Sequence, residues 1–315
     1  MIRILFMGTP EFAALSLEAL LEAQFEVIGV VTQPDRPKGR GLELKPSEVK
    51  VLALNRNLPV WQPEEVSAPE FLQVFTGLKP DLVVVVAFGQ KIPPEILFGP
   101  RLGCVNVHGS LLPQYRGAAP IHRSILNGDT VTGITTMYMD EGWDTGDIIY
   151  QEATPIDPEE NFGSLYLRLG KIGGELLVKT IKDLESGVAP RIKQNEALAT
   201  KAFKLKPELQ TIDWKNPGRF IHNQVRVLAP APGVGTTLNE ERLKIIRTKI
   251  YDSPISSEKT ASPGEIIEII KNQGILTATS TEPLLLVEVQ PLGKKVMGAL
   301  EFANGRRLKA GMRFL

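Results

Sequence analysis

Short apolar runs alternate with helical patterns over the first 190 residues, and this alternation limits the possible folds more than any other feature. The run Ile2–Met7 ends at Gly8. Thr9-Pro10-Glu11 follows, and it is typical of a helix start with a capping threonine, a proline and an acidic first turn. Similar runs follow at 25–32, 82–88, 104–108, 132–139 and 148–156, with helical patterns at 46–57 and 163–184. Strands that alternate with helices form a parallel sheet covered on both faces, so we predict an α/β fold.

A change in sequence character after Ser186-Gly187 divides the 315 residues into two parts. A chain of this length exceeds what a single hydrophobic core usually fills, so two domains are expected. Residues 191–208 are rich in lysine and have little apolar periodicity, and we interpret them as a basic linker. One helical segment at Pro217–Leu228 then precedes several β-rich segments separated by Gly, Pro and Ser. We therefore predict a first domain over 1–190 and a smaller β-barrel domain over 209–315.

Composition and missing motifs exclude several classes of protein. The single Cys104 and three scattered histidines allow neither an internal disulfide nor a zinc site, so we expect no metal and an inert, buried thiol. The turn after the first strand lacks the Gly-x-Gly-x-x-Gly spacing, and no Walker motif is found, so no dinucleotide or simple ATP site is predicted. The apolar stretch Leu82–Phe88 is far shorter than the roughly 20 residues of a membrane helix, and the opening residues are too few for a signal sequence. We expect no membrane partner and a cytoplasmic location.

Basic charge gathers near the C-terminus although the whole chain is neutral, with 36 basic and 36 acidic residues. Between Pro291 and Leu315 there are six basic residues and one acidic residue, Glu301. This local excess fits a polyanionic partner, and it equally fits an ordinary solvated surface. The charge pattern alone leaves both interpretations open.

Asn106 and His108 lie at the end of the apolar run that starts at Cys104. Ligands of open α/β sheets bind outside the carboxyl ends of the strands, and side chains two positions apart share one face of a strand. The alternative is that both side chains are buried for structural reasons and form hydrogen bonds only with backbone groups. The loop Asp140–Asp147 could add a carboxylate, or it could be a solvated acidic turn. An amide, an imidazole and a carboxylate in one place would supply an oxyanion donor, a proton-transfer group and a charge to orient it.

The stretch Asn106–Ile121, NVHGSLLPQYRGAAPI, resembles the signature of folate-dependent formyltransferases. Its RGAAPI ending is similar to the methionyl-tRNA branch of that family. Asp144-Thr145-Gly146 resembles the second motif of the family, and GTPEFA from Gly8 and QPDRPKGRG from Gln33 resemble further blocks. The resemblance therefore spans nearly the whole chain. Trp143 departs from the aliphatic residue that is usual before the aspartate, and Pro230–Val234 lacks an expected tryptophan.

The resemblance implies a Rossmann-like formyltransferase domain followed by a C-terminal barrel resembling an OB fold. It implies that the catalytic residues are Asn106, His108 and Asp144. It implies folate contacts for Ser110, Leu111, Leu112, Pro113, Phe88, Gly89 and Ile92. The loop of Arg36, Lys38 and Arg40 resembles an insertion that engages the tRNA acceptor end, although its composition also fits a plain surface loop. We expect Lys204 and Lys206 to hold the acceptor stem through its phosphates.

The reaction implied is transfer of a formyl group from 10-formyltetrahydrofolate to the amino group of initiator methionyl-tRNA. We assign Asn106 as an amide donor to the oxyanion and His108 as a second donor and proton mediator. Asp144 is assigned to orient His108 and to help remove the amine proton through water. The alternatives are a small amine acceptor such as glycinamide ribonucleotide or an amino sugar, a formylfolate hydrolase, and a non-catalytic module that binds RNA or folate. The partners expected are a reduced folate and aminoacylated initiator tRNA, and we expect a monomer.

Overall fold

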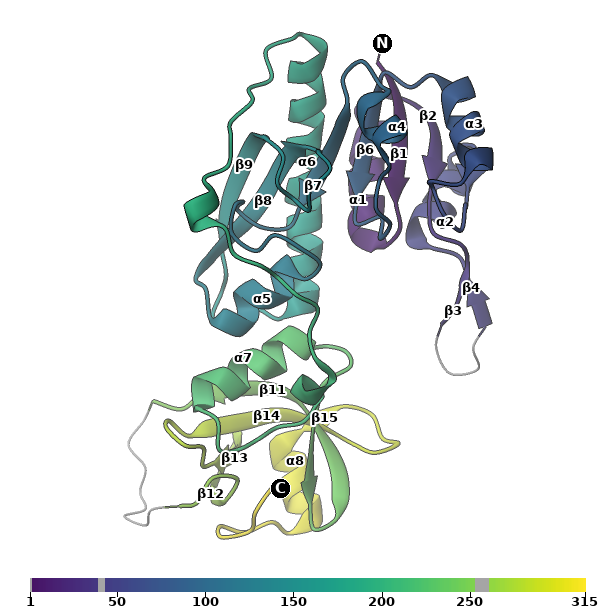
Figure 1. Cartoon of the computed structure of the whole chain (residues 1–315). Helices are drawn as coiled ribbons and strands as arrows, with labels where there is room; N and C mark the ends of the chain where they lie inside the picture. The colour runs from purple at the N-terminus through teal and green to yellow at the C-terminus, as the bar shows by residue number, and fades with distance from the viewer. Residues whose placement is uncertain (1, 39–42, 253–260) are drawn as a thin grey trace. The chain divides into compact units, whose positions relative to one another are not determined.

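The computed structural model describes residues 2–38, 43–252 and 261–315, which fold as two compact units (Figure 1). The first unit consists of residues 1–120, 131–154 and 166–203. The second unit consists of residues 121–130, 155–165 and 204–315. Two short segments from the first 165 residues therefore pack with the C-terminal part, which the sequence pattern did not indicate. Among the described residues, no helix combines the length and apolar character needed to cross a membrane.

A seven-stranded sheet with the order β5-β2-β1-β6-β7-β8-β9 forms the centre of the first unit. Its strands are β1 (Arg3–Gly8), β2 (Glu26–Val31), β5 (Val60–Trp61), β6 (Leu82–Val86), β7 (Cys104–His108), β8 (Val131–Tyr138) and β9 (Ile148–Pro155). All pairs from β5 to β7 are parallel, whereas β8 is antiparallel to β7. Every residue of β6 and β7 is buried, as expected for central strands covered on both faces. The predicted α/β fold with a parallel sheet is confirmed.

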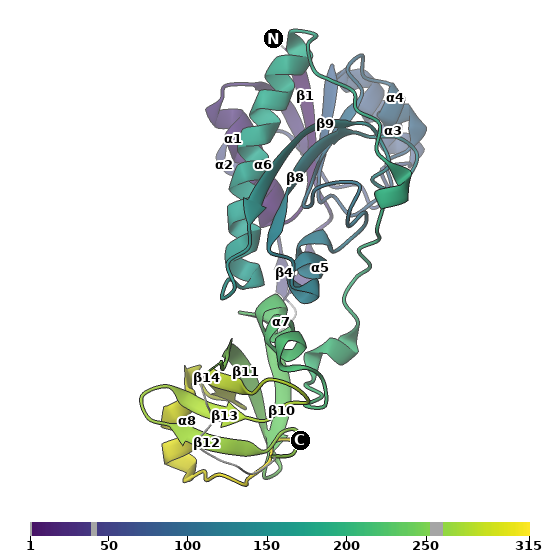
Figure 2. The same cartoon turned by 90° about the vertical axis from the view of Figure 1, so that its left-hand side faces the viewer.

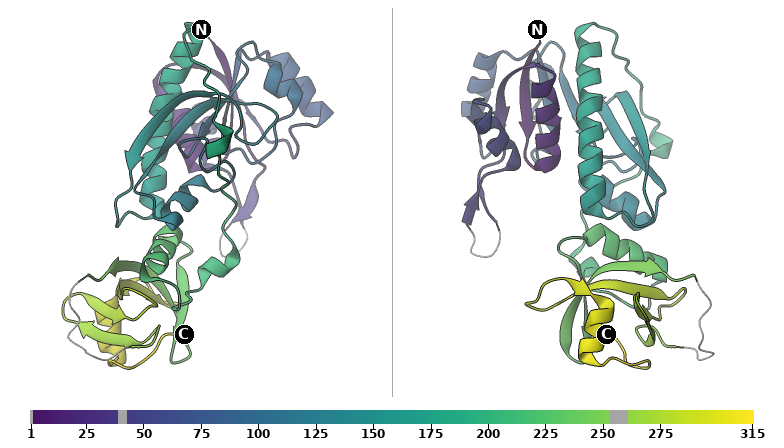
Figure 3. Two further views of the ribbon diagram at one scale, coloured as in Figure 1. Left: turned by 60° about the vertical axis from the view of Figure 1, so that its left-hand side comes forward. Right: turned by 180° about the vertical axis from the view of Figure 1, so that it is seen from behind.

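Helices cover both faces of this sheet, as Figure 2 shows and the views of Figure 3 repeat from other sides. One face carries α1 (Glu11–Glu22) and α6 (Phe162–Glu185), with α2 (Glu48–Asn55) packed against α1. The other face carries α3 (Pro69–Leu78) and α4 (Pro94–Phe98). A short antiparallel hairpin, β3 (Arg36–Lys38) and β4 (Glu43–Lys45), follows β2. The hairpin, α3 and α4 are elements that the apolar periodicity did not reveal.

The first helix starts one residue later than the sequence pattern predicted. Pro10 is the N-cap of α1, so the predicted capping role of Thr9 is wrong. The hydroxyl of Thr9 instead donates to the backbone oxygen of Phe88 (3.2 Å) and accepts from the backbone N–H of Gln33 (3.4 Å). Thr9 therefore ties the turn after β1 to the loop after β6.

The alternation of side chains along β7 assigns Asn106 and His108 to one face of the sheet. Cys104 packs in a core cluster with side chains of α3 and α4. Val107 points to the opposite face, where a Cβ atom added to Gly173 of α6 would lie 3.0 Å from Val107 Cγ1. Successive side chains of a strand alternate, so Asn106 and His108 lie on the same face as Cys104. Asn106 and His108 lie toward the carboxyl end of β7. The core cluster includes Cys104, at the start of this strand, but neither of these two residues.

The second unit is an antiparallel sheet with the order β10-β11-β14-β13-β12, on which β15 pairs with β14. Its strands are β10 (Val234–Leu238), β11 (Glu241–Ile250), β12 (Ile266–Ile270), β13 (Gly274–Thr277), β14 (Leu284–Pro291) and β15 (Met297–Gly298). Its helices include α7 (Gly218–Leu228), which packs against β11, and α8 (Ala299–Arg306), which packs against β13 and β14. The helix α5 (Pro120–Asn127) also belongs to this unit, except for Pro120, which belongs to the first unit.

The last residues of the chain connect the two edges of this sheet. The backbone N–H of Leu315 donates to the Thr237 oxygen on β10 (2.9 Å). The backbone N–H of Phe314 donates to the Gly264 oxygen, just before β12 (2.8 Å). These bonds close the sheet, which leaves neither edge unpaired at this point. The predicted small β-barrel is confirmed.

Candidate active site

β7 brings Asn106 and His108 to the carboxyl edge of the parallel strands. His108 is 6% exposed and Asn106 9% exposed, so both polar side chains are buried. Among the described residues, no hydrogen-bond partner is found for the Asn106 side chain, whereas the His108 ring has two polar neighbours. A buried amide without a protein partner has its donor available for a ligand.

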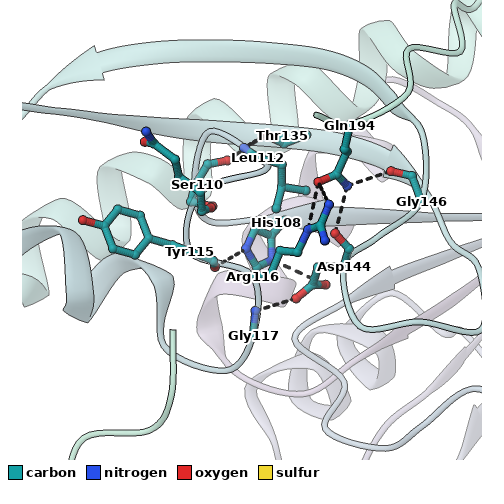
Figure 4. A network of polar contacts seen from close by, with 11 residues as sticks. His108, Ser110, Leu112, Tyr115, Arg116, Gly117, Thr135, Asp144, Gly146 and Gln194 are labelled. Carbon is teal, nitrogen blue, oxygen red and sulfur yellow. Dashed lines mark hydrogen bonds and ion pairs between the residues drawn. The ribbon is translucent and has the colours of Figure 1, made fainter. Parts of the chain in front are cut away.

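The two ring nitrogens of His108 have different partners (Figure 4). Nε2 lies 2.9 Å from the backbone oxygen of Tyr115, which can only accept a hydrogen bond, so Nε2 carries a proton. Nδ1 lies 3.7 Å from Oδ1 of Asp144. The neutral ring therefore has its lone pair on Nδ1, facing a carboxylate oxygen.

The position of Asp144 does not follow from the rule for parallel strands. Because β8 runs antiparallel to β7, Tyr138 near its end pairs with Val105, close to the start of β7. The loop after β8 therefore starts far from His108, and it must carry Asp144 back along the strand. Asp144 has a φ of 57°, in the left-handed region that non-glycine residues rarely adopt. Additional contacts must hold it there.

Contacts from several directions hold the Asp144 loop. The backbone N–H of Gly117 donates to Oδ2 of Asp144 (2.8 Å). The side-chain amide of Gln194 donates to the backbone oxygens of Asp144 (2.8 Å) and Gly146 (2.7 Å). A Cβ atom on Gly146 would lie 1.9 Å from the Tyr138 oxygen, so only glycine permits the close return of the loop onto β8.

The loop that follows His108 is fixed to the neighbouring strands. Thr135, which pairs with His108 across β7 and β8, donates to the Ser110 oxygen (2.7 Å) and accepts from the Leu112 N–H (3.1 Å). Gln151 on β9 donates to the Leu112 oxygen (2.8 Å) and to the Thr135 hydroxyl (3.0 Å). These bonds fix the backbone of the predicted folate-contacting stretch relative to β7.

Residues 194–202, which we interpreted as part of a linker, complete this region. The Thr200 hydroxyl accepts from the Tyr115 N–H (2.8 Å), and the Thr200 oxygen accepts from the Arg116 N–H (2.8 Å). Ala202 donates to the Arg116 oxygen (2.7 Å) and accepts from the Ala119 N–H (3.1 Å). The segment thus holds the same backbone that contacts His108. Sequence reasoning missed it because these residues form no apolar pattern and carry no motif, so nothing in them indicated a role in the site.

The predicted folate residues fall into two groups. Leu112, Phe88 and Ile92 are 3%, 2% and 4% exposed, and their side chains pack in hydrophobic clusters. Ser110 is buried, and its hydroxyl donates to the Gln114 oxygen (2.6 Å). The side chains that retain solvent contact are those of Leu111 and Pro113, while Gly89, with a φ of 89°, offers only its backbone.

The predicted tRNA residues lie on exposed segments or outside the described residues. Arg36 of β3 is exposed and forms an ion pair with Glu64 (2.9 Å). Only the backbone of Lys38 is described, and Arg40 lies outside the described residues. Lys204 and Lys206 are both exposed in the second unit, where Lys206 is the N-cap of a short 3-10 helix at Pro207–Gln210.

Cys104 is the single cysteine of the chain and lies in the core of the first unit. No group of three or more potential metal ligands is found in the described part of the chain. Burial raises the pKa of the Cys104 thiol, and its Sγ donates to the Ile96 oxygen (3.2 Å). The thiol is therefore an inert part of the core, as predicted.

An α/β unit that brings an imidazole and a carboxylate together beside the carboxyl end of a parallel strand has the arrangement of an enzyme that transfers groups with proton exchange. Comparisons with known proteins identify which kind. Residues 2–181 match the family model for formyl transferase, and residues 204–307 match that for the formyl transferase C-terminal domain. The chain belongs to the formyl transferase family.

Two relatives named methionyl-tRNA formyltransferase match over nearly their full length. The protein from Symbiobacterium thermophilum is 48% identical, over 100% of this chain and 95% of its own. The protein from Bacillus subtilis is 46% identical, over 99% of this chain and 97% of its own. Among solved structures, a sugar 3N-formyl transferase in the presence of dTDP and 5-N-formyl-THF matches with a TM-score of 0.67 and 23% identity. It covers 94% of this chain and 99% of its own. That likeness supports the fold.

Proposed function

We propose that this enzyme transfers a formyl group from 10-formyltetrahydrofolate to the amino group of methionyl-tRNA. The observation that carries the proposal is the match, at 48% identity over the whole chain, to a relative of that name. The cluster of Asn106, His108 and Asp144 supports it, because this chemistry needs an oxyanion donor and a proton-transfer group.

The transfer exchanges one C–N bond for another. The amine nitrogen attacks the formyl carbon, a tetrahedral oxyanion forms, and the bond from that carbon to N10 of the folate then breaks. The amine loses a proton and the folate nitrogen gains one, so the proton count balances. The enzyme must therefore accept a proton, stabilise an oxyanion and return a proton to the leaving nitrogen.

His108 is the group that we assign to the proton transfers. Its Nε2 proton is held by the Tyr115 oxygen, so Nδ1 accepts the proton of the attacking amine. The imidazolium so formed faces Oδ1 of Asp144, whose charge stabilises it. The separation of 3.7 Å is long for a hydrogen bond, and such contacts shorten when the ring is charged. Nδ1 then returns the proton to the folate nitrogen.

Asn106 is assigned to the oxyanion. Its amide is buried on the same face as His108, and no other described residue takes up its hydrogen-bonding capacity. A pre-placed amide donor in a water-poor site contributes roughly 3 to 4 kcal/mol to such a transition state. In this assignment, the orienting role that the sequence suggested for Asp144 passes to the Tyr115 carbonyl, and Asp144 stabilises charge.

The folate is proposed to contact mainly backbone groups around Ser110–Pro113 and Gly89. The side chains of Phe88, Leu112 and Ile92 pack in hydrophobic clusters, and we propose that they support this backbone from the core side of the folate site. For the tRNA, the exposed Lys204 and Lys206 are proposed to contact phosphates, which position a substrate without reading its sequence.

A small amine acceptor is the alternative, since sugar formyl transferases share the fold. The test measures transfer of labelled formyl from 10-formyltetrahydrofolate to charged initiator tRNA, uncharged tRNA, glycinamide ribonucleotide and an amino sugar nucleotide. We expect transfer to charged tRNA alone, and its loss by orders of magnitude in His108→Ala with the melting temperature retained. Transfer to a small amine at a comparable kcat/KM would refute the tRNA assignment. Near wild-type turnover of His108→Ala would refute the proton-transfer assignment.

A further inference from the structure

Resting on the function proposed above, we infer that Gln194 and Arg116 form a positioning pair that aims Asp144 at His108. Strand geometry does not deliver Asp144 to this place, because β8 ends at the far end of β7. The loop has to be held by contacts from elsewhere in the first unit. Gln194 supplies the contacts that bear on the backbone of Asp144 itself (Figure 4).

All four hydrogen-bonding positions of the Gln194 amide are occupied. Its nitrogen donates to the oxygens of Asp144 (2.8 Å) and Gly146 (2.7 Å). Its oxygen accepts from Nε (3.0 Å) and an Nη atom (2.9 Å) of Arg116. The reversed amide would set an oxygen against two carbonyls and an NH2 group against a guanidinium, so only one orientation is possible. Gln194 therefore transmits the position of Arg116 to both ends of the Asp144–Gly146 turn.

Arg116 is itself fixed at the centre of the site. Its side chain is 10% exposed and forms a two-fold hydrogen-bonded ion pair with Glu196, at 2.7 and 2.8 Å. The hydrogen bonds that Arg116 donates to Glu196 raise the pKa of Arg116, and the charges of Glu196, Asp140 and Asp144 raise it further. The guanidinium is thus a permanently charged, planar group, and its N–H groups can donate in pairs to the Gln194 amide oxygen and the Glu196 carboxylate.

The residues on either side of Arg116 contact the two proposed catalytic groups directly. The Tyr115 oxygen accepts from His108, and the Gly117 N–H donates to Asp144. A single tripeptide therefore holds the ring through its first residue and the carboxylate through its last. Its central side chain reaches the carboxylate loop through Gln194. A shift of Arg116 would change the distance between His108 and Asp144 from both sides.

A positioning role predicts a loss of turnover without a loss of substrate binding. In Gln194→Glu an oxygen replaces the NH2 group, so two carbonyls lose their donor and face a negative charge. We expect kcat to fall about a hundredfold, the cost of a displacement of about 1 Å, while KM for the folate changes less than about twofold. Arg116→Lys keeps the charge but loses the paired N–H donors that hold the Gln194 oxygen, and we expect a fall in kcat of about tenfold.

Gln73→Glu is the matched control, since it makes the same amide-to-carboxylate change on α3 of the first unit, away from Asp144. Gln73 is exposed, so we expect kcat to change less than about threefold. Each variant is assayed well below its melting temperature, with kcat expressed per folded enzyme. A purely structural role for Gln194 would lower the melting temperature and leave kcat per folded enzyme unchanged, which would overturn the inference.

A double-mutant cycle separates this inference from the proposed function. If Gln194 acts through Asp144, Gln194→Ala lowers kcat in the wild type but has little further effect in Asp144→Ala. Equal effects in both backgrounds would overturn the positioning role while Asp144 keeps its assignment. A near wild-type kcat for Asp144→Ala would instead remove the catalytic assignment and, with it, the reason for positioning.

Discussion

Acidification should destabilise the second unit through His122, a histidine that the proposed chemistry does not use. His122 lies on α5, and its ring stacks on Phe162 with centroids 3.9 Å apart. Burial lowers the pKa of His122 from 6.5 to about 4, and the positive charge of Arg123 adds to this effect. Below pH 6.5 His122 therefore binds a proton in the unfolded chain, whereas in the folded chain it stays neutral until the pH approaches about 4. Stability is retained above pH 6.5 and lost as the pH falls toward about 4.

The size of this effect follows from the two pKa values. Between pH 7 and pH 5 the proton taken up by the unfolded state amounts to about 2 kcal/mol. Because the ring is partly exposed, we expect a loss of about 1 to 2 kcal/mol in the free energy of unfolding. His122→Phe keeps the stack with Phe162 and removes the titrating group, so the variant should lose correspondingly less stability on acidification.

The assay compares the free energy of opening of β14 amides by hydrogen exchange, in wild type and His122→Phe, at pH 7 and pH 5. Between pH 7 and pH 5, the free energy of opening should fall by about 1 to 2 kcal/mol more in the wild type than in the variant. Part of the acid sensitivity will remain in the variant, because burial also lowers the pKa of His222 in α7. Identical losses in the two proteins would show that His122 does not titrate in this window, and the reasoning from burial would be refuted.

Two further variants test contacts with tRNA, one at the two lysines proposed above and one at Trp143, for which we propose a contact here. Lys204→Ala with Lys206→Ala should weaken tRNA binding and lower the slope of log affinity against log salt by roughly 1.5, since each phosphate contact contributes about 0.7 to 0.9. A salt titration of tRNA affinity checks this, and an unchanged slope would contradict the assignment. Trp143→Ala should leave the melting temperature nearly unchanged, because Trp143 is 68% exposed. Its position next to Asp144 suits stacking on a base near the amine, so KM for charged tRNA should rise about fivefold or more, with KM for folate unchanged. Equal KM values for tRNA in variant and wild type would exclude this contact.

The sheet and the first two candidate residues were predictable because they depend on local patterns. The strand β7 is an apolar run, and period-two alternation alone assigns Asn106 and His108 to one face. The partner of His108 was harder to predict. Asp144 was found from its motif, but no sequence pattern indicated that β8 is antiparallel or that the loop returns along β7. Strand direction depends on the connection between elements, which a strand's own residues do not encode.

The division into units was less predictable, because single side chains decide it. Arg226 on α7 is 8% exposed, and one of its Nη atoms donates to the oxygens of Asp157 (3.1 Å) and Glu160 (3.0 Å). His222, one turn earlier, lies 3.1 Å from the Pro158 oxygen. These contacts join residues 155–165 to a helix some 60 positions later in the chain. A basic residue on an amphipathic helix normally predicts a solvated face, so this buried arginine could not be recognised.

The signature Asn106–Ile121 combines the proposed catalytic groups with half of the framework that holds them. Asn106 and His108 would supply chemistry, while the following backbone fixes the His108 ring at Tyr115 and the carboxylate of Asp144 at Gly117. Gly117 is needed for physical reasons, since its φ is 119° and an added Cβ atom would lie 3.0 Å from the Ala202 oxygen.

The other half of the framework comes from residues 194–202, which carry no recognisable motif. Gln194 and Thr200 act through an amide and a hydroxyl that any polar surface segment could contain. Their importance depends on what they touch, and it emerges only when the chain is folded. A truncation at residue 190 would keep all three proposed catalytic residues and remove this half of the framework. Such a chain should retain the signature and lose the geometry, so activity should require the segment through Ala202 even if folate binding survives without it.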